Sequence, residues 1–367
     1  MSNILFIAND DWYIKSHRSD LLIKTKYHFS KVGLLTNISK KTKLEKHIKI
    51  FDWQMNKKSI NLFKIIFEVK KIFTTIKEFS PDLIHCIGMK PIILMSILNF
   101  FINKKTTYAF TGFGILDSRY SLKYKLMKKI FFFCFFYLAR NTTFKIIVQN
   151  TENKNYLINL GVSKNKIKFI PGTGLSFKKK IKIKPPKIKT ILFAGRLLWS
   201  KGVKEFIECS NSEYFLNQNV KFLLIGSPDY GSSDAISVEY LKSQNNKNFT
   251  WLKKQKSLDK FFSKSYLFLY PSTYGEGTPR VVLEAFRHSL PVIAFRNPGC
   301  NDIIKNNLNG FLIEPKNTKK MINKLMFLLN NKTVRNKIGR NAYNYAKKNF
   351  SNKKVFIDTH KVWKQFL

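Results

Sequence analysis

The segment YPSTYGEGTPRVVLEAFRHSLPVIAF, residues 270–295, decides the fold of this chain. Its first and last residues end short apolar runs typical of strands, and a helix is expected over Pro279–Arg287. Thr278 is expected to cap this helix, with Pro279 in its first turn. Strand, helix and strand in succession form the unit from which parallel α/β sheets are built.

Two carboxylates of this segment suit the recognition of hydroxyl groups. Seven residues separate Glu276, on a glycine-flanked loop, from Glu284, about two turns inside the expected helix. A carboxylate accepts hydrogen bonds from two sugar hydroxyls, and the start of a helix offers free N–H groups to phosphate or sugar oxygens. Gly277 lets the backbone approach a ligand closely. The alternative interpretation is that Glu276 caps the helix and Glu284 pairs with a surface lysine.

An earlier strand-to-helix loop carries two cations. The expected strand TILFAG ends at Gly195, and Arg196 and Lys201 follow before the next helix. Arginine grips two phosphate oxygens at once, while lysine supplies a compact charge. The start of a helix adds free backbone N–H groups. This loop therefore predicts a diphosphate site.

Apolar runs and helical stretches alternate along the whole chain, which indicates parallel sheets covered on both faces. The expected strands are 4–8, 83–86, 107–110, 146–148, 167–170, 190–195, 222–225, 249–252, 267–270 and 292–295. The expected domains are an N-terminal α/β domain over 1–175, a basic linker over 176–189, a second α/β domain over 190–347 and a C-terminal helix over 348–367 that returns towards the first domain. The strand ends of the two domains are expected to face each other across a cleft.

The chain is strongly basic, with 66 Lys and Arg against 22 Asp and Glu and a net charge of +44. A surface of this sign attracts anionic membranes, phosphorylated substrates or nucleic acid, but no nucleic-acid-binding module is recognisable. A genome composition that favours lysine is the alternative explanation. Four well-separated cysteines form no zinc or redox motif, and no signal peptide precedes the first strand. A reduced, cytoplasmic compartment is therefore expected.

The stretch KLMKKIFFFCFFYLAR, residues 125–140, combines an apolar run with flanking cations. The run is too short for a membrane span, which needs about 20 residues. Two interpretations remain, a buried core helix or a helix that lies on a membrane surface.

The motifs of the C-terminal half resemble the donor domain of family 4 retaining glycosyltransferases. The resemblance rests on FAGRLLWSKGVKEFIE and on the segment from Pro271 to Pro315, and it extends over residues 191–347. It implies the GT-B fold of two Rossmann-like domains. The donor-binding residues that it implies are Gly195, Arg196 and Lys201 for the diphosphate, Glu284 for the ribose, and Glu276, Gly277, Thr278 and Pro279 for the transferred sugar.

The N-terminal half resembles a narrower branch, which builds O-antigen, capsule or other lipid-linked glycans. The motifs are SHR (16–18), IHCIGMKP (84–91), TGFG (111–114), VQN (148–150) and PGTGL (171–175). In that branch His17 would lie near the transferred sugar or the acceptor phosphate, and Ser16 would cap the helix. Hydrogen bonding in a purely structural role is the alternative for His17. The further residues expected to line the cleft are Ser16, Arg18, Gly112, Gly114, Asn150 and Gly226.

One segment departs from the family pattern. Many family 4 enzymes carry a glycine-rich loop after the first strand, whereas this chain has ANDDWYIKSHR. Asp10 and Asp11 are interpreted as a solvated turn and not as a catalytic pair. Because the N-terminal domain normally selects the acceptor, this departure leaves the acceptor open.

The resemblance implies a retaining hexosyltransferase that uses a nucleoside-diphosphate sugar, with UDP favoured, and no metal or other cofactor. The residues expected to carry catalysis are Glu276, Arg196, Lys201 and His17. The expected acceptor is a growing glycan on a polyprenyl diphosphate, with the enzyme bound to the anionic inner face of the cytoplasmic membrane and to no nucleic acid. Two alternatives are a sugar-nucleotide epimerase of the same fold, which would ignore an acceptor, and a catalytically silent sugar-nucleotide binder.

Overall fold

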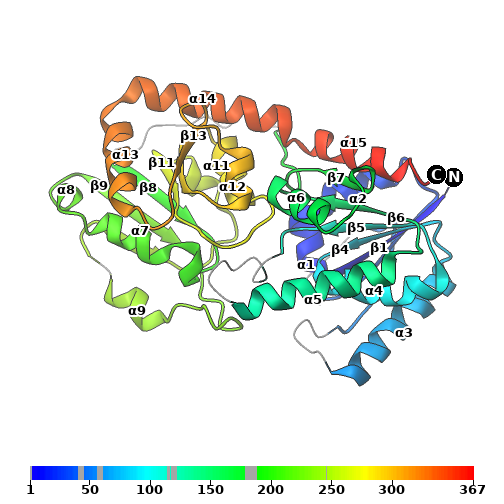
Figure 1. Cartoon of the computed structure of the whole chain (residues 1–367). Helices are drawn as coiled ribbons and strands as arrows, with labels where there is room; N and C mark the ends of the chain where they lie inside the picture. Colours follow the sequence, from blue (N-terminus) through cyan, green and yellow to red (C-terminus); the bar gives the residue numbers. More distant parts are fainter. Residues whose placement is uncertain are drawn as a thin grey trace. The chain divides into compact units, whose positions relative to one another are not determined.

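The computed structural model describes residues 2–39, 45–55, 61–113, 116, 122–177, 188–244 and 246–367 (Figure 1). The chain forms two compact units. The first comprises Met1–Gly174, Gly275–Gly277 and Asn352–Leu367, and the second comprises Leu175–Tyr274 and Thr278–Ser351. Residues 178–187 of the expected linker lie outside the described residues, and so does Gly114.

The first unit is built on a seven-stranded sheet of order β3-β2-β1-β4-β5-β6-β7, in which every neighbouring pair is parallel. Its strands are β1 (Asn3–Asp10), β2 (Lys31–Asn37), β3 (Ile48–Asp52), β4 (Leu83–Ile87), β5 (Thr106–Phe110), β6 (Phe144–Val148) and β7 (Ile167–Phe169). Its helices are α1 (Asp11–Tyr13), η1 (Ile14–Arg18), α2 (Ser19–Thr25), α3 (Leu62–Phe79), α4 (Met89–Ile102), α5 (Leu122–Ala139), α6 (Thr151–Asn159), η3 (Lys164–Lys166) and α15 (Asn352–Trp363).

Helices cover both faces of this sheet. Side chains alternate along each strand, so successive residues are buried on opposite faces. Leu5 and Ile7 of β1 pack into a cluster with α3, α4 and α5. Ile4 and Phe6 point to the opposite face and pack with α2 and α15. Figure 1 shows α3, α4 and α5 along one face of the sheet and α15 on the other.

The second unit is built on a six-stranded parallel sheet of order β10-β9-β8-β11-β12-β13. Its strands are β8 (Lys189–Ala194), β9 (Val220–Ile225), β10 (Phe249–Leu252), β11 (Leu267–Tyr270), β12 (Val292–Phe295) and β13 (Gly310–Ile313). Its helices are η4 (Trp199–Lys201), α7 (Val203–Ser210), α8 (Glu213–Leu216), α9 (Val238–Ser243), α10 (Asp259–Phe262), α11 (Arg280–Arg287), α12 (Pro298–Ile303), α13 (Thr318–Asn330) and α14 (Lys332–Asn349).

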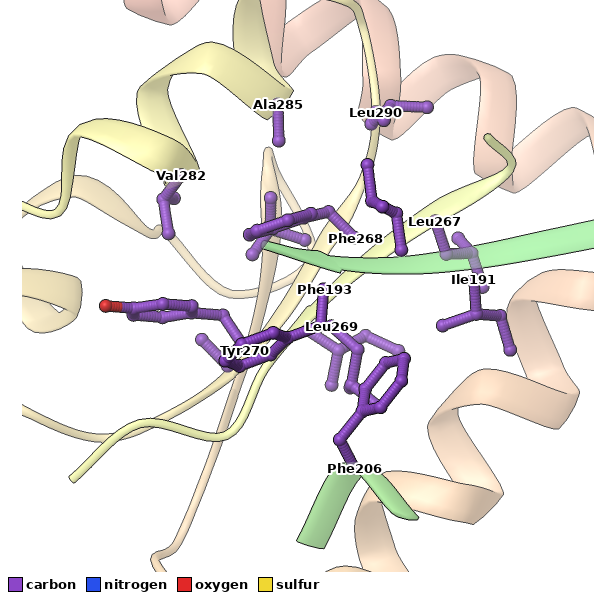
Figure 2. Packing of buried hydrophobic residues seen from close by; sticks show 14 of the residues in the cluster. Ile191, Phe193, Phe206, Leu267, Phe268, Leu269, Tyr270, Val282, Ala285 and Leu290 are labelled. Carbon is purple, nitrogen blue, oxygen red and sulfur yellow. The ribbon is translucent and has the colours of Figure 1, made fainter. Parts of the chain in front are cut away.

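Aromatic side chains fill the centre of the second unit. The ring of Phe193 on β8 lies 5.6 Å from that of Phe206 on α7 and 6.2 Å from that of Tyr270 on β11, measured between centroids (Figure 2). Contacts of this length fix the spacing between neighbouring strands and the covering helix. The end of β11, where polar groups follow, is thereby held against the end of β8.

Each sheet reverses its strand order beside its first strand. In the second unit the chain leaves β8 towards β9 and β10 on one side, and later continues through β11, β12 and β13 on the other. Open parallel sheets bind ligands outside the carboxyl ends of the strands at such a switch point. The switch point of the second unit lies between β8 and β11, which are the two strands that precede the predicted diphosphate and sugar loops.

The C-terminal segment completes the core of the first unit. Trp363 is fully buried, and its ring packs edge-on against Phe6 and His85. Its indole Nε1 donates a hydrogen bond to Nδ1 of His85 at 3.2 Å. Because Nδ1 accepts, this geometry suits a neutral imidazole.

His85 should make the stability of the first unit depend on pH. Burial, and to a smaller extent the Arg18 guanidinium, lowers the pKa of His85 from 6.5 to about 3. Between these values the unfolded chain binds the proton and the folded chain does not, so stability falls as the pH drops below about 6.5, by up to about 1.4 kcal/mol per pH unit. Urea unfolding of wild type and His85→Gln across this range should show a shallower loss in the variant. Parallel curves would contradict the assignment.

Candidate functional site

Lys201 lies at the switch point of the second unit. Its side chain is buried, with 3% of the residue exposed. Its Nζ lies 3.4 Å from the hydroxyl of Tyr270 and 4.4 Å from the ring centroid of Tyr274. A phenol oxygen and a ring face thus hold the ammonium group beside the end of β11. Such a fixed cation suits an anionic group bound at the strand ends.

Arg196 projects from the same loop and is half exposed. Its Nη1 forms an ion pair with Oδ2 of Asp229 at 3.0 Å, and its guanidinium lies 5.3 Å from the ring centroid of Tyr274. Exposed ion pairs contribute little stability, at most about 1 kcal/mol. An incoming diphosphate can therefore displace Asp229 at small cost.

Glycines set the shape of this cationic loop. Gly202 has a φ of +80°, and a Cβ at that position would lie 2.0 Å from the carbonyl oxygen of Pro271. A Cβ at Gly226 would lie 2.0 Å from the carbonyl oxygen of Gly195. Gly226 thus lets the loop after β8 pack closely on the end of β9, and Gly202 turns the chain into α7 immediately after Lys201.

Residues that the sequence did not reveal tie these loops together. The carbonyl oxygen of Ser200 accepts hydrogen bonds from the backbone N–H of Thr273, at 2.8 Å, and from its hydroxyl, at 3.2 Å. Asp234 accepts from the backbone N–H of Ser200 at 3.1 Å and also from its hydroxyl. The only signal in the sequence was the group of acids and turn residues in GSPDYGSSD after the strand that ends at Ile225.

The start of α11 differs from the prediction by one residue. Pro279, and not Thr278, occupies the cap position before the first helical residue, so the expectation that Thr278 stands at the cap is wrong. Pro279 has an extended backbone (ψ 107°), and the helix begins at Arg280. Because proline has no backbone N–H, its place before Arg280 removes one of the donors that a helix start leaves without an intrahelical partner.

Glu284 lies inside α11 as expected, and an arginine holds it. Nε of Arg280 lies 2.9 Å from Oε1 of Glu284, one turn along the same helix, and both side chains are largely shielded, with 28% and 21% exposed. The neighbouring positions Val282 and Phe286 are buried in the core. The partner of Glu284 is therefore Arg280 and not the surface lysine of the alternative interpretation.

Glu276 and Gly277 belong to the first unit. Nδ2 of Asn150 donates to the carbonyl oxygen of Glu276 at 2.9 Å, while Oδ1 of Asn150 accepts from the backbone N–H of Asn153 at 2.6 Å and caps α6. A Cβ on Gly112, which has a φ of +111°, would lie 2.5 Å from the backbone nitrogen of Gly277. In this arrangement the close approach that Gly112 and Gly277 permit is to other parts of the protein, including the side chain of Gln149 and the carbonyl oxygen of Thr111.

The SHR motif lies in the π-helical turn η1, a distortion that is common at functional sites. The hydroxyl of Ser16 donates to the carbonyl oxygen of Trp12 at 2.8 Å and lies 2.5 Å from Nδ1 of His17. When the hydroxyl proton is donated to the Trp12 carbonyl, Nδ1 of His17 donates to the serine oxygen. The expectation that Ser16 caps a helix is wrong, because Ser16 lies within the turn. The His17 ring stacks on Tyr13 at 4.8 Å.

Two further side chains near this motif are buried, contrary to expectation. Arg18 is 4% exposed and lies near His85, so it does not line an open surface. Asp11 is 1% exposed and accepts a hydrogen bond from the backbone N–H of Ser39 at 2.7 Å. The interpretation of Asp11 as part of a solvated turn is therefore wrong, and its role is to anchor the segment that follows β2.

Among the residues that the structure describes, no three His, Cys, Asp or Glu side chains come together as a metal-binding group.

The structure brings the predicted residues together in four local groups. These are Arg196 and Lys201 with Tyr274, Glu284 with Arg280, Glu276 and Gly277 with Gly112 and Asn150, and Ser16 with His17.

Two family models match the chain. The model "Glycosyl transferases group 1" matches residues 176–345, and "Glycosyl transferase 4-like" matches residues 3–150. The chain is 26% identical to the capsular polysaccharide biosynthesis glycosyltransferase CapM of Staphylococcus aureus, over 85% of this chain and 84% of CapM. It is 31% identical, over 54% of each chain, to the N,N'-diacetylbacillosaminyl-diphospho-undecaprenol alpha-1,3-N-acetylgalactosaminyltransferase of Campylobacter jejuni.

A solved structure also matches nearly the whole chain. The Anabaena protein HepE, in complex with UDP and glucose, superposes with a TM-score of 0.79 at 18% identity, covering 99% of this chain and 100% of its own. At this identity the match shows the two-domain GT-B fold alone.

Replacing Gly202 with alanine should destabilise the second unit. The variant pays for a left-handed backbone and for the clash with the Pro271 carbonyl, together about 2–4 kcal/mol. Gly161→Ala is the matched control, because Gly161 has a φ of +88° and a Cβ there would meet nothing within 4 Å. Thermal unfolding should show a clearly larger loss for Gly202→Ala than for Gly161→Ala, and equal losses would show that the close packing is unimportant.

Pyrophosphate titrated by calorimetry should report on the cationic loop. Lys201→Gln should weaken binding by about tenfold or more, because one charge-assisted contact is lost. Asp229→Asn should strengthen binding several-fold, because Arg196 is released from its ion pair. Lys204→Gln, an exposed change on α7, should leave the affinity unchanged. Weaker binding in Asp229→Asn would exclude competition between Asp229 and the anion.

Proposed function

Since this chain belongs to the GT-B glycosyltransferases of the group 1 and family 4 type, we propose that it is a retaining hexosyltransferase. It moves a hexose or N-acetylhexosamine from a nucleoside-diphosphate sugar, with UDP as the favoured nucleotide, to a hydroxyl of a growing glycan. The acceptor glycan is carried on a polyprenyl diphosphate, as in the assembly of capsule or O-antigen.

The observation that carries this proposal is the pair of cations at the switch point of the second unit. Arg196 is accessible and Lys201 is fixed by Tyr270 and Tyr274, so one cation adapts to the ligand and the other is preorganised. Departure of a nucleoside diphosphate builds negative charge on its phosphate oxygens. Fixed positive charges stabilise that change, and removal of one such group typically costs a factor of about 10² to 10³ in rate.

The proposed chemistry needs no protein nucleophile and no metal ion. The acceptor oxygen forms a bond to the anomeric carbon on the face that the diphosphate leaves, and the bond from that carbon to the phosphate oxygen breaks. The proton of the acceptor hydroxyl passes to the departing phosphate oxygen. Bond formation on the leaving-group face retains the anomeric configuration.

The remaining residues bind and orient the substrates. Glu284, which Arg280 holds in place, accepts hydrogen bonds from the ribose hydroxyls. Glu276 and the backbone of Gly277–Pro279 contact the transferred sugar. His17, whose Nδ1 contacts Ser16, would use its other nitrogen towards the sugar or the acceptor phosphate.

The acceptor and the location are supported by relatives and by charge. The Campylobacter relative is named for an undecaprenyl diphosphate-linked acceptor, and CapM is named for capsular polysaccharide biosynthesis. Residues 1–189 contain 37 Lys and Arg against 10 Asp and Glu, an excess of 27, whereas residues 190–367 have an excess of 17. An enzyme at the inner face of the cytoplasmic membrane would meet both a lipid-linked acceptor and anionic headgroups.

A panel of donor sugars tests the proposal. Purified protein would be incubated with UDP-, GDP- and ADP-sugars, with and without extracted polyprenyl-linked acceptors, and the products identified by mass spectrometry. One donor should be consumed only when the acceptor is present. Glu276→Ala and Arg196→Ala should each reduce turnover by about 10² or more. Arg296→Ala, which removes an exposed arginine paired with Glu314, is the matched control and should retain activity.

The outcomes separate the candidate functions. An acceptor-independent epimer or free sugar would favour the epimerase, and donors unchanged with every acceptor would favour a silent binder. The anomeric coupling constant of the product, measured by NMR, decides between retention and inversion.

A further inference from the structure

Three helices of the first unit carry an unusual amount of exposed apolar surface. α4 packs against both α3 and α5, and the three cover one face of the sheet (Figure 1). On α3 the exposed side chains are Phe63, Ile66 and Phe67, and at the end of α4 Phe101 is 76% exposed. Isolated exposed hydrophobic residues are normal, whereas a group on adjacent helices marks an interaction surface.

α5 provides the longest part of this surface. Its exposed apolar residues, with 51–86% of each residue accessible, are Leu122, Leu126, Ile130, Phe133 and Tyr137. At 100° per residue these positions fall within a stripe about 80° wide and about 22 Å long. The buried residues Phe132, Phe135 and Ala139 lie on the opposite side of the helix. One side of α5 is therefore core, as the first interpretation of this stretch expected, and the other side is exposed.

Within the described residues of α5 and at its end, cations flank the stripe and carboxylates do not. Lys123, Lys125 and Lys129 are exposed on α5, Arg140 follows its end, and the helix contains no acidic residue. On α3, the exposed Lys70 and Lys71 continue from the apolar first turns. The two acids of α3 already have lysine partners, since Glu68 pairs with Lys90 and Glu78 with Lys49.

We propose that the outer face of α3, the end of α4 and α5 is a docking surface for an anionic lipid bilayer. The apolar stripe would enter the boundary between headgroups and acyl chains, with the lysines among the anionic headgroups. A second copy of the chain fits this face poorly, because contact between two such surfaces would bring lysines together without carboxylates to neutralise them. No helix within the described residues is long and apolar enough to cross a membrane.

This inference deepens the proposed function, since a lipid-linked acceptor would be met at such a surface, but the docking itself needs neither donor nor acceptor. It assigns the contact to the helices on one face of the first sheet. The opposite face, covered by α2 and α15, is not part of the surface.

Vesicle co-sedimentation tests the proposal. Full-length protein would be mixed with phosphatidylcholine vesicles, or with vesicles that also contain phosphatidylglycerol, at low and high salt. Wild type should bind the anionic vesicles and lose binding at high salt. Lys125→Glu/Lys129→Glu and Leu126→Gln/Phe133→Gln should each reduce the bound fraction by about tenfold or more. The matched controls on α13, Lys319→Glu/Lys320→Glu and Phe327→Gln, should bind as wild type does.

Each alternative result overturns the proposal. These are no binding by wild type, equal binding to neutral vesicles, unchanged binding by both α5 variants, or equal loss in the α13 controls. A dimer in sedimentation velocity that the α5 substitutions dissociate would assign the face to a second copy. UDP binding by the α5 variants, measured by calorimetry, should match wild type and excludes misfolding. Normal vesicle binding without any glycosyl transfer would refute the proposed function and leave the docking surface intact.

Discussion

The burial of two parallel sheets is the constraint on which the rest of this structure depends. A parallel strand cannot return by a tight turn, so each connection crosses the sheet as a helix and covers one of its faces. When the chain starts in the middle of a sheet and winds outwards in both directions, two adjacent strands are followed by loops that run in opposite directions. In the second unit these strands are β8 and β11. The loops after them carry the cations and Tyr274, and Tyr270 is the last residue of β11.

The groups at this switch point are held in place by contacts of unequal strength. Lys201 is buried against two aromatic side chains, and the loop that carries it is hydrogen-bonded through Ser200 to Thr273 and Asp234. Arg196 is half exposed, and its ion pair with Asp229 lies at the surface. A site that keeps one cation fixed and lets another exchange partners can bind a diphosphate and later release it as a product. Under the proposed function, the same loops would serve both preorganisation and product release.

The two helical layers of the first unit differ in the chemistry of their outer sides. α15 fills its face with buried Trp363 and Val355, so that layer is closed by the chain itself. The layer of α3, α4 and α5 buries only its inner side and leaves phenylalanines and lysines outside. Exposing that much apolar surface in water is unfavourable, which is the physical reason to seek its partner in a medium that is itself apolar and bordered by negative charge.

Local pattern was enough to identify the α/β class and most of the strands. Buried parallel strands are unbroken apolar runs such as ILFIA and VIAF, and the loops that follow them carry the conspicuous Arg196, Lys201, Glu276 and Glu284. The strands β2, β3 and β13 were missed. β3 lies at the edge of its sheet with three of its five residues exposed, so it has no continuous apolar run in the sequence.

The sequence by itself determined which residue types stand at the ends of which strands, because covalent order fixes the loop that follows each apolar run. Only the tertiary structure decided the partners of these residues: Asp229 for Arg196, Tyr270 for Lys201, and Arg280 instead of a surface lysine for Glu284. It also decided that Arg18 and Asp11 are buried. Burial and pairing depend on segments that are distant in the chain and meet only when the sheet assembles, so no local pattern contains them.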